Sequence, residues 1–245
     1  MTGWPKRCAR PWIYGHRGVR DSVPENTISA FEQSLKLGAD GIEFDVQICR
    51  DGTLIVFHDS TLERMTAGDD NRRISEVPAN DLCRIQLGQG AAIPKFSEVL
   101  SWANNRQLYL NIELKTNGDD ARTLVRAVER EISESANAAL LSRLLISSFS
   151  ADVITLANTR DWIWPFAQLL GPDDPIRTNN GEFMNCGVHV HFSLVNEVQL
   201  ASWKHGYKFI NVWTVNTQSA VMQLASAAVD GIITDYPELA RNAVD

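Results

Sequence analysis

A histidine and an arginine stand side by side near the start of the chain, with a glycine on either side (Gly15, His16, Arg17 and Gly18). Such a pair does not suit a hydrophobic core, and the glycines predict a backbone that turns or approaches a ligand closely. A guanidinium can hold two phosphate oxygens at once, and an imidazole can transfer protons near neutral pH. We therefore expect this segment to bind a phosphate ester.

Carboxylates follow in two later apolar segments: Glu43 and Asp45 flank an apolar residue, and Glu113 precedes Lys115 by two positions. Side chains alternate between the faces of a strand, so Glu43 and Asp45 point the same way, as do Glu113 and Lys115. Three converging carboxylates favour a cation between them, and oxygen ligands favour Mg2+ or Ca2+ over zinc. The alternative is that the charges pair without a metal, Glu113 with Lys115 and Asp45 with Arg17.

A second histidine, His58, ends an apolar run and is followed directly by Asp59. A lone histidine after a strand is most often a hydrogen-bonding residue with no catalytic role. Beside His16, an arginine and a cation, however, it is suited to be one half of an acid–base pair around a phosphoryl group. The sequence thus predicts His16 and His58 as the catalytic residues.

The order of elements predicts the scaffold that must bring these residues together. Apolar runs alternate with helical patterns, and the runs at 12–14 and 41–48 are the first two of eight principal strands if the run at 53–59 is an excursion. Eight strand–helix units predict a (β/α)8 barrel, in which the working residues lie at the C-terminal ends of the strands. A doubly wound open sheet is the alternative, and it is weakened because no glycine-rich nucleotide loop follows the first strand.

An irregular polar stretch at 60–94 interrupts this alternation. We expect one domain over residues 1–245, with 60–94 as a small inserted lid after the second strand. The first helix is expected to have Asn26 as its N-cap and to end at Gly38. Apolar residues between the carboxylates, such as Phe44, would face the helices.

The composition limits the possible partners. A net charge of −7 argues against nucleic acid as a partner and still permits a small phosphate ester in a locally positive pocket. The four cysteines are scattered without metal-ligand spacing, which argues against zinc and against a disulfide framework. Neither a signal-peptide core nor a membrane-spanning stretch is visible, so we expect a cytoplasmic location and no membrane insertion. The oligomeric state is not indicated.

Eight short motifs, in order along nearly the whole chain, resemble those of the glycerophosphodiester phosphodiesterase family. They are HRG (16–18), PENT (24–27), GADGIEFDV (38–46), DGTLIVFHD (51–59), IELK (112–115), SSF (147–149), VWTVN (212–216) and DGIITDYP (230–237). The resemblance implies a (β/α)8 barrel with a small insertion after the second strand.

The resemblance also implies a role for each matching residue. The implied metal ligands are Glu43, Asp45 and Glu113, the catalytic pair is His16 and His58, and the phosphate contacts are Arg17 and Lys115. In the family, the glycerol hydroxyl of the substrate attacks phosphorus, and water then opens the cyclic phosphate to sn-glycerol 3-phosphate. One histidine removes the proton and the other protonates the departing alcohol. Two alternatives remain open, namely a lyase that stops at the cyclic phosphate and a silent barrel that only binds phosphate esters.

A few further residues have more than one interpretation. Trp213 and Phe149 end strands beside the expected pocket, and we interpret Trp213 as an apolar wall for the substrate, while Phe149 is left open between wall and packing. His189 and His191 share one face of a strand, and packing and substrate contact are equally compatible with that position. Glu25 is expected to brace Arg17.

Overall fold

The strands form a closed barrel in the computed structural model, which describes residues 9–20, 23–117, 120–160, 162–175 and 186–245. The ring closes because β1 (Trp12–His16) pairs in parallel with both β2 (Gly41–Ile48) and β9 (Gly231–Thr234). Between β2 and β9, the described residues add β4 (Tyr109–Leu114), β5 (Leu144–Ser148), β6 (Phe166–Leu170), β7 (Cys186–His191) and β8 (Ile210–Trp213), all parallel. The predicted eight-stranded barrel is confirmed, and the open-sheet alternative is wrong.

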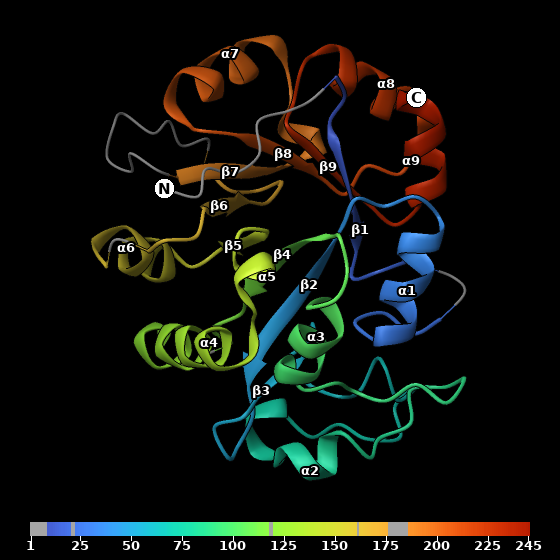
Figure 1. Ribbon diagram of the computed structural model, residues 1–245, viewed down its shortest axis with the longest axis vertical. Coiled ribbons are helices and arrows are strands. Elements are labelled where there is room, and N and C mark those ends of the chain that lie inside the picture. Colours follow the sequence, from blue (N-terminus) through green and yellow to red (C-terminus); the bar gives the residue numbers. More distant parts are fainter. Residues whose placement is uncertain (1–8, 21–22, 118–119, 161, 176–185) are drawn as a thin grey trace.

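Helices surround this ring of strands, as Figure 1 shows. The longer ones are α1 (Ile28–Lys36), α3 (Phe96–Ala103), α4 (Ala121–Ser135), α6 (Ala151–Thr159), α7 (Glu197–Gly206), α8 (Gln218–Ser226) and α9 (Pro237–Val244). Single turns form α2 (Ala79–Leu82), α5 (Ala138–Leu141), η1 (Ile74–Glu76) and η2 (Phe192–Leu194). In the described part of the chain, none of the helices is long and apolar enough to cross a membrane.

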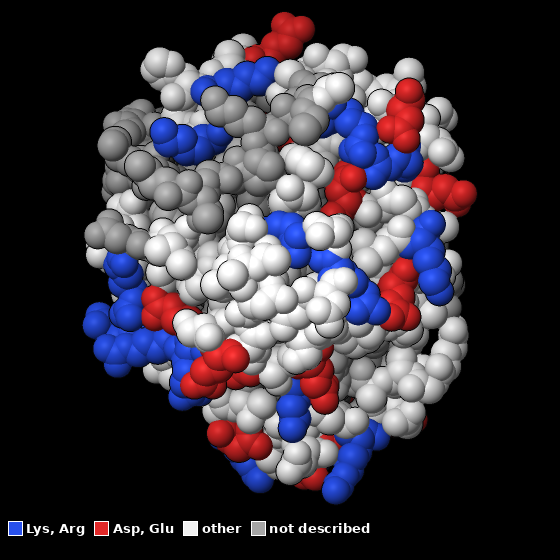
Figure 2. All heavy atoms as spheres, in the orientation of Figure 1, with Lys and Arg blue, Asp and Glu red and all other residues white. Residues whose placement is uncertain are grey.

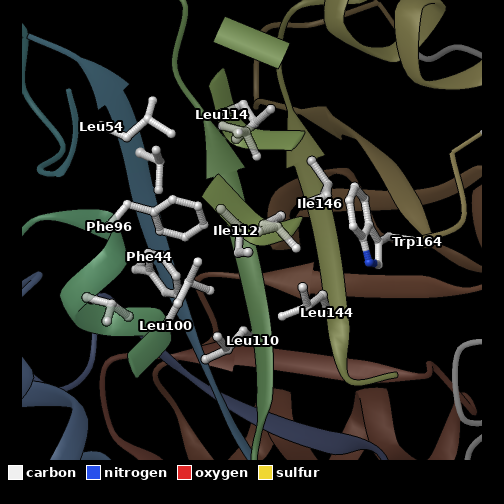
Figure 3. Close-up of a cluster of buried hydrophobic side chains, with 14 of the residues drawn as sticks. Phe44, Leu54, Phe96, Leu100, Leu110, Ile112, Leu114, Leu144, Ile146 and Trp164 are labelled. Carbon is white, nitrogen blue, oxygen red and sulfur yellow. The ribbon is translucent and has the colours of Figure 1, made fainter. Parts of the chain in front are cut away.

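The main hydrophobic core lies between the barrel and its helices, and Figure 3 shows the part next to α3. Phe44 of β2 packs near Phe96 of α3, with ring centroids 6.1 Å apart. Ile112 and Leu114 of β4 belong to the same buried cluster. Burying each such side chain stabilises the fold by roughly 1.5–3 kcal/mol. Because alternate residues of β2 and β4 face the helices, the carboxylates between them must point into the barrel, as predicted.

The segment at 60–94 follows β3 (Leu54–Val56), which pairs antiparallel with the end of β2. This segment carries η1 and α2, at the lower edge of Figure 1. Its apolar residues form a cluster separate from the main core, together with Ile55 and Phe57. Thr61 and Arg73 form an antiparallel bridge across it. The segment is therefore a folded excursion with its own small core, placed where the sequence predicted an insertion.

The start of α1 differs from its prediction. The N-cap is Thr27, whose Oγ1 accepts a hydrogen bond from the Ala30 amide at 3.3 Å. Asn26 has a left-handed backbone with φ of +57°, and its side chain donates instead to Asp45 Oδ2 at 2.8 Å. The left-handed turn aims the Asn26 amide into the barrel, so the capping position moves one residue along. The predicted end of the helix is right, because Gly38 takes φ of +90° directly after the C-cap.

Candidate active site

A cavity of about 130 Å3 opens at the C-terminal ends of the barrel strands. All the predicted site residues line it except Asp45, which is fully buried. The lining consists of His16, Arg17, Glu43, His58, Asn111, Glu113, Lys115, Ser147, Phe149, Leu169, Trp213 and Ile233. Residues that are far apart in the sequence thus meet at the edge where parallel strands of a barrel end.

Three carboxylates meet at the cavity, and one oxygen each from Glu43, Asp45 and Glu113 lies within 4.8 Å of the others. Neighbouring strands set this arrangement, because Asp45 of β2 stands directly beside Glu113 of β4. Burial, together with the neighbouring carboxylates, raises the pKa of Glu43 and of Glu113. Burial also acts to raise the pKa of Asp45, but Lys115 and Arg17 outweigh it and hold that pKa below its usual value.

Two cations reach into this cluster. Lys115 Nζ lies 2.6 Å from Glu113 Oε1 and 3.2 Å from Asp45 Oδ1, and Arg17 Nε lies 3.3 Å from Asp45 Oδ2. The ion pairs that sequence analysis offered as an alternative to a metal are therefore present together with the carboxylate cluster. Burial acts to lower the pKa of Lys115, but Asp45 and Glu113 raise it above its usual value, so the ammonium stays charged.

The carboxylate cluster fits a hard divalent ion. Two cations neutralise two of the three carboxylates, which leaves negative charge in a buried place. Asp45 Oδ1 is buried and accepts no hydrogen bond, although Lys115 lies near it. An unsatisfied buried oxygen among carboxylates suits a metal ligand, and an all-oxygen donor set suits Mg2+ or Ca2+. These three residues could therefore hold a metal ion.

Arg17 stands on a turn at the end of β1. Its φ is +52° and that of Gly18 is +96°, so the predicted turn is present. The glycines have a further reason, which the sequence did not predict. A Cβ on Gly15 would lie 1.9 Å from Ser34 Oγ, and one on Gly18 would lie 2.6 Å from the Ala30 Cβ, so both glycines leave room for helix α1.

The turn fixes the guanidinium of Arg17 over the carboxylates. Its backbone amide donates to Glu43 Oε2 at 3.1 Å, and its Nη1 donates to Glu25 Oε1 at 2.9 Å. Glu25 thus braces Arg17 as expected. Burial acts to lower the pKa of Arg17, and Asp45, Glu25 and Glu43 raise it. A permanent positive charge therefore lies at the cavity wall.

Each of the two histidines is held by a carboxylate to which the sequence alone assigned no role. His16 Nδ1 lies 2.8 Å from Asp235 Oδ1, and His58 Nδ1 lies 2.6 Å from Asp59 Oδ1. A carboxylate accepts and does not donate, so each Nδ1 carries the proton and each Nε2 is the nitrogen left for chemistry. Burial, and then Lys115 and Arg17, lower the pKa of His58, against Asp45, which raises it.

Signals for these two carboxylates were present in the sequence. Asp59 follows His58 directly, and Asp235 follows Thr234, the last residue of β9. Since β9 neighbours β1 in a closed barrel, a carboxylate after β9 is expected to reach His16 at the end of β1. Asn216 Nδ2 also donates to Asp235 Oδ2 at 2.7 Å, which fixes the carboxylate.

The other side of the cavity is apolar. Phe149 meets Trp213 edge to face at 5.6 Å, with Leu169 and Ile233 beside them. The cavity therefore has an ionic wall and an apolar wall, as a small ester with both kinds of group requires.

His189 and His191 do not line this cavity. His189 is fully buried, its Nε2 lies 2.9 Å from Asn211 Nδ2, and burial lowers its pKa to about 3, so it is neutral. It is a packing residue with hydrogen bonds. His191 meets Trp213 edge to face, with ring centroids 5.1 Å apart, and its Nδ1 forms a hydrogen bond with Ser193.

The outer surface contrasts with this concentrated charge. Figure 2 shows acidic and basic side chains interspersed over one face of the molecule, with neutral areas between them. The protein has a net charge of −7, so its overall charge does not attract a phosphate group. The positive charge that could do so comes from Arg17 and Lys115 inside the cavity.

The closed ring of eight parallel strands, with charged residues at the strand ends, defines a TIM-barrel protein, and comparison with known proteins specifies which kind. Residues 16–239 match the model of the Glycerophosphoryl diester phosphodiesterase family, and the chain belongs to this family. It is thereby an enzyme, a glycerophosphodiester phosphodiesterase.

Individual relatives match this chain over nearly their whole length. A glycerophosphodiester phosphodiesterase of Caldanaerobacter subterraneus subsp. tengcongensis is 31% identical over 95% of this chain and 97% of its own. A glycerophosphodiester phosphodiesterase of Bacillus altitudinis is 30% identical over 93% and 96%. The structure of an Oleispira antarctica phosphodiesterase in complex with the product sn-glycerol-3-phosphate superposes with a TM-score of 0.86, at 26% identity over 96% of this chain and 97% of that one.

Proposed function

We propose that this chain hydrolyses glycerophosphodiesters to sn-glycerol 3-phosphate and an alcohol, in a reaction that depends on a divalent cation and on His16 and His58. The observation that carries the proposal is one cavity with three clustered carboxylates, two cationic side chains and two carboxylate-backed histidines. The product complex of the Oleispira antarctica relative supports the choice of substrate class.

Glu43, Asp45 and Glu113 would hold the ion, Mg2+ or Ca2+, which supplies positive charge against the charge that develops on the phosphoryl oxygens. Arg17 and Lys115 contact the phosphate. The planar guanidinium of Arg17 suits two phosphate oxygens at once, and its brace on Glu25 restricts its orientation before substrate arrives.

The two histidines divide the proton transfers. His16 Nε2 takes the proton of the glycerol hydroxyl, whose oxygen then forms the new bond to phosphorus. His58 acts as an imidazolium, with a second proton on Nε2, and gives that proton to the alcohol oxygen as the bond of this oxygen to phosphorus breaks. The product of this first half is a cyclic glycerophosphate. Water opens the ring in the second half, with the two histidines in exchanged roles, and sn-glycerol 3-phosphate leaves.

Asp235 and Asp59 orient the two rings, since each Nδ1 donates to its carboxylate and leaves Nε2 to accept the proton in His16 and to give it in His58. Trp213 forms the apolar wall against the glycerol carbons, with Phe149 at its edge.

The whole chain, 1–245, acts as one catalytic domain with 60–94 as a lid. A cytoplasmic location stays a prediction.

The test is an assay for sn-glycerol 3-phosphate release over a panel of glycerophosphodiesters, with and without a chelator. We expect release from a water-soluble diester such as glycerophosphocholine, its loss with chelator, and its return with added Mg2+ or Ca2+. Accumulation of a cyclic phosphate without release would favour the lyase. Binding of the diester without any turnover would favour a silent barrel, and either result would overturn the proposal.

A further inference from the structure

Arg64 lies outside the cavity, in the segment that follows β3, and its guanidinium joins two carboxylates that serve the site. Its Nε donates to Asp59 Oδ2 at 2.6 Å. On its other edge, Nη2 donates to Glu25 Oε1 at 2.6 Å and Nη1 donates to Glu25 Oε2 at 3.2 Å. Three of its donor groups are thus hydrogen-bonded to two carboxylates that come from different parts of the chain.

Each of those carboxylates has a second partner at the cavity wall. Asp59 holds His58 Nδ1 through its other oxygen, and Glu25 Oε1 also accepts from Arg17 Nη1. A continuous series of hydrogen bonds therefore runs from one cavity residue to another through Arg64. Because His58 and Arg17 both line the cavity, the series links the predicted acid to the predicted phosphate contact.

We propose that Arg64 is a positioning residue, which fixes the distance and orientation between the His58 ring and the Arg17 guanidinium and so ties both to the inserted segment. The proposal rests on the proposed function. A lysine could not replace it, because a single ammonium cannot span two carboxylates with a bidentate bond to one of them. The side chain of Arg64 is 49% exposed, and an ion pair that exposed contributes little to stability. Its value therefore lies in geometry.

The inserted segment offers a matched control. Arg72 makes the same kind of charged contact with Asp70, at 2.6 Å, and its side chain is 52% exposed. Neither Arg72 nor Asp70 lines the cavity or bonds to a residue that does. Arg64→Gln and Arg72→Gln therefore remove the same chemical group from the same segment, and only the first removes a link to the site.

The experiment compares these two variants, and Arg64→Lys, in glycerophosphocholine turnover, thermal melting and binding of sn-glycerol 3-phosphate. We expect Arg64→Gln to lower kcat/KM by roughly 10- to 100-fold, through both kcat and KM, because a small misplacement of reacting groups has effects of that size. Arg64→Lys should recover only a minor part, and Arg72→Gln should match the wild type. All three should melt close to the wild type.

Binding of sn-glycerol 3-phosphate by the inactive or active protein separates this inference from the proposed function. If the wild type releases no sn-glycerol 3-phosphate, the proposed function fails. Weaker product binding by Arg64→Gln than by Arg72→Gln would still support the positioning role. Equal kinetics and equal product binding for the two variants would overturn the role of Arg64, whatever the wild type does, and so would full recovery in Arg64→Lys.

Discussion

His16 and His58 are held by the same kind of hydrogen bond, but different parts of the molecule support them. His16 ends β1, and its carboxylate, Asp235, follows the neighbouring strand β9 and is 5% exposed. His58 and Asp59 follow β3, and the carboxylate of Asp59 also accepts a hydrogen bond from Arg64, which is half exposed. We call His16 with Asp235 the barrel arm, because both residues lie at the ends of strands of the barrel. We call His58 with Asp59 the insertion arm, because it depends on the inserted segment at 60–94.

This difference has a physical consequence. The barrel arm is fixed by parallel pairing of β1 with β9 and by the amide of Asn216 on Asp235. The insertion arm depends on charged contacts that water can reach, and such contacts hold geometry less firmly than a strand ladder does. We infer that the His16 arm tolerates changes in 60–94, and that the His58 arm is the one through which this segment affects the reaction.

The largest effect should come from removing the divalent cation, which the reaction requires whichever histidine acts. Chelation should abolish turnover, because Glu43, Asp45 and Glu113 are arranged to hold a cation and Lys115 and Arg17 balance only two of the three carboxylates. The measurement is sn-glycerol 3-phosphate release before and after chelation, with Mg2+ or Ca2+ added back. Full activity after thorough chelation would contradict the metal role.

The next effect distinguishes the arms directly. Asp235→Asn and Asp59→Asn should each lower kcat by roughly 10- to 100-fold, the usual effect of removing a group that orients a ligand or a base. Asp59→Asn should also raise KM, because it releases Arg64 and, through Glu25, Arg17. Asp235→Asn should leave KM close to the wild-type value. Identical kinetics for the two variants would show that the arms are equivalent.

A smaller loss is expected for Arg17→Lys. The ammonium keeps the charge but cannot offer two parallel donors to a phosphate, so kcat/KM should fall at least ~10-fold. The brace on Glu25 would be weakened as well. Steady-state kinetics on glycerophosphocholine are the check, and an unchanged kcat/KM would remove Arg17 from the phosphate site.

The smallest effect concerns a histidine that has amide partners in place of a carboxylate. Burial lowers the pKa of His189 to about 3, so its imidazole is neutral in the native protein. In the unfolded chain the His189 imidazole binds a proton below about pH 6.5, whereas in the folded protein it stays neutral. The free energy of unfolding is therefore unaffected by the titration of this histidine above that pH and decreases as the pH falls below it. The loss at pH 5 is about 2 kcal/mol. Urea unfolding of His189→Gln should depend less on pH between 7 and 5, and an unchanged dependence would exclude this account.

The sequence was sufficient to predict the barrel and the residues that face its mouth. Alternation along β2 and β4 places Glu43, Asp45 and Glu113 on one side and Phe44 and Ile112 on the other, and both strands are long enough for that pattern to be unambiguous. Side-chain direction in a strand is a local property, so a single segment is enough to predict it.

The supporting contacts were harder to predict, because they depend on where the chain returns. Asp235 lies 219 residues from His16, and only closure of the barrel brings them together. Arg64 meets Glu25 across 39 residues through a folded insertion without regular periodicity. The glycines of the first motif were assigned to a ligand, since a sequence does not distinguish a ligand from a helix as the close neighbour.

The most direct test of the central claim replaces each catalytic histidine and changes the leaving group. His16→Ala and His58→Ala should each lower kcat on glycerophosphocholine roughly 10²–10⁴-fold, the usual effect of losing a positioned proton transfer. In a nitrophenyl ester of glycerophosphate, the nitrophenolate leaves without needing a proton. This substrate should therefore largely restore the kcat of His58→Ala and not that of His16→Ala. Rescue of neither variant, or of both equally, would contradict the assignment of base and acid to the two arms.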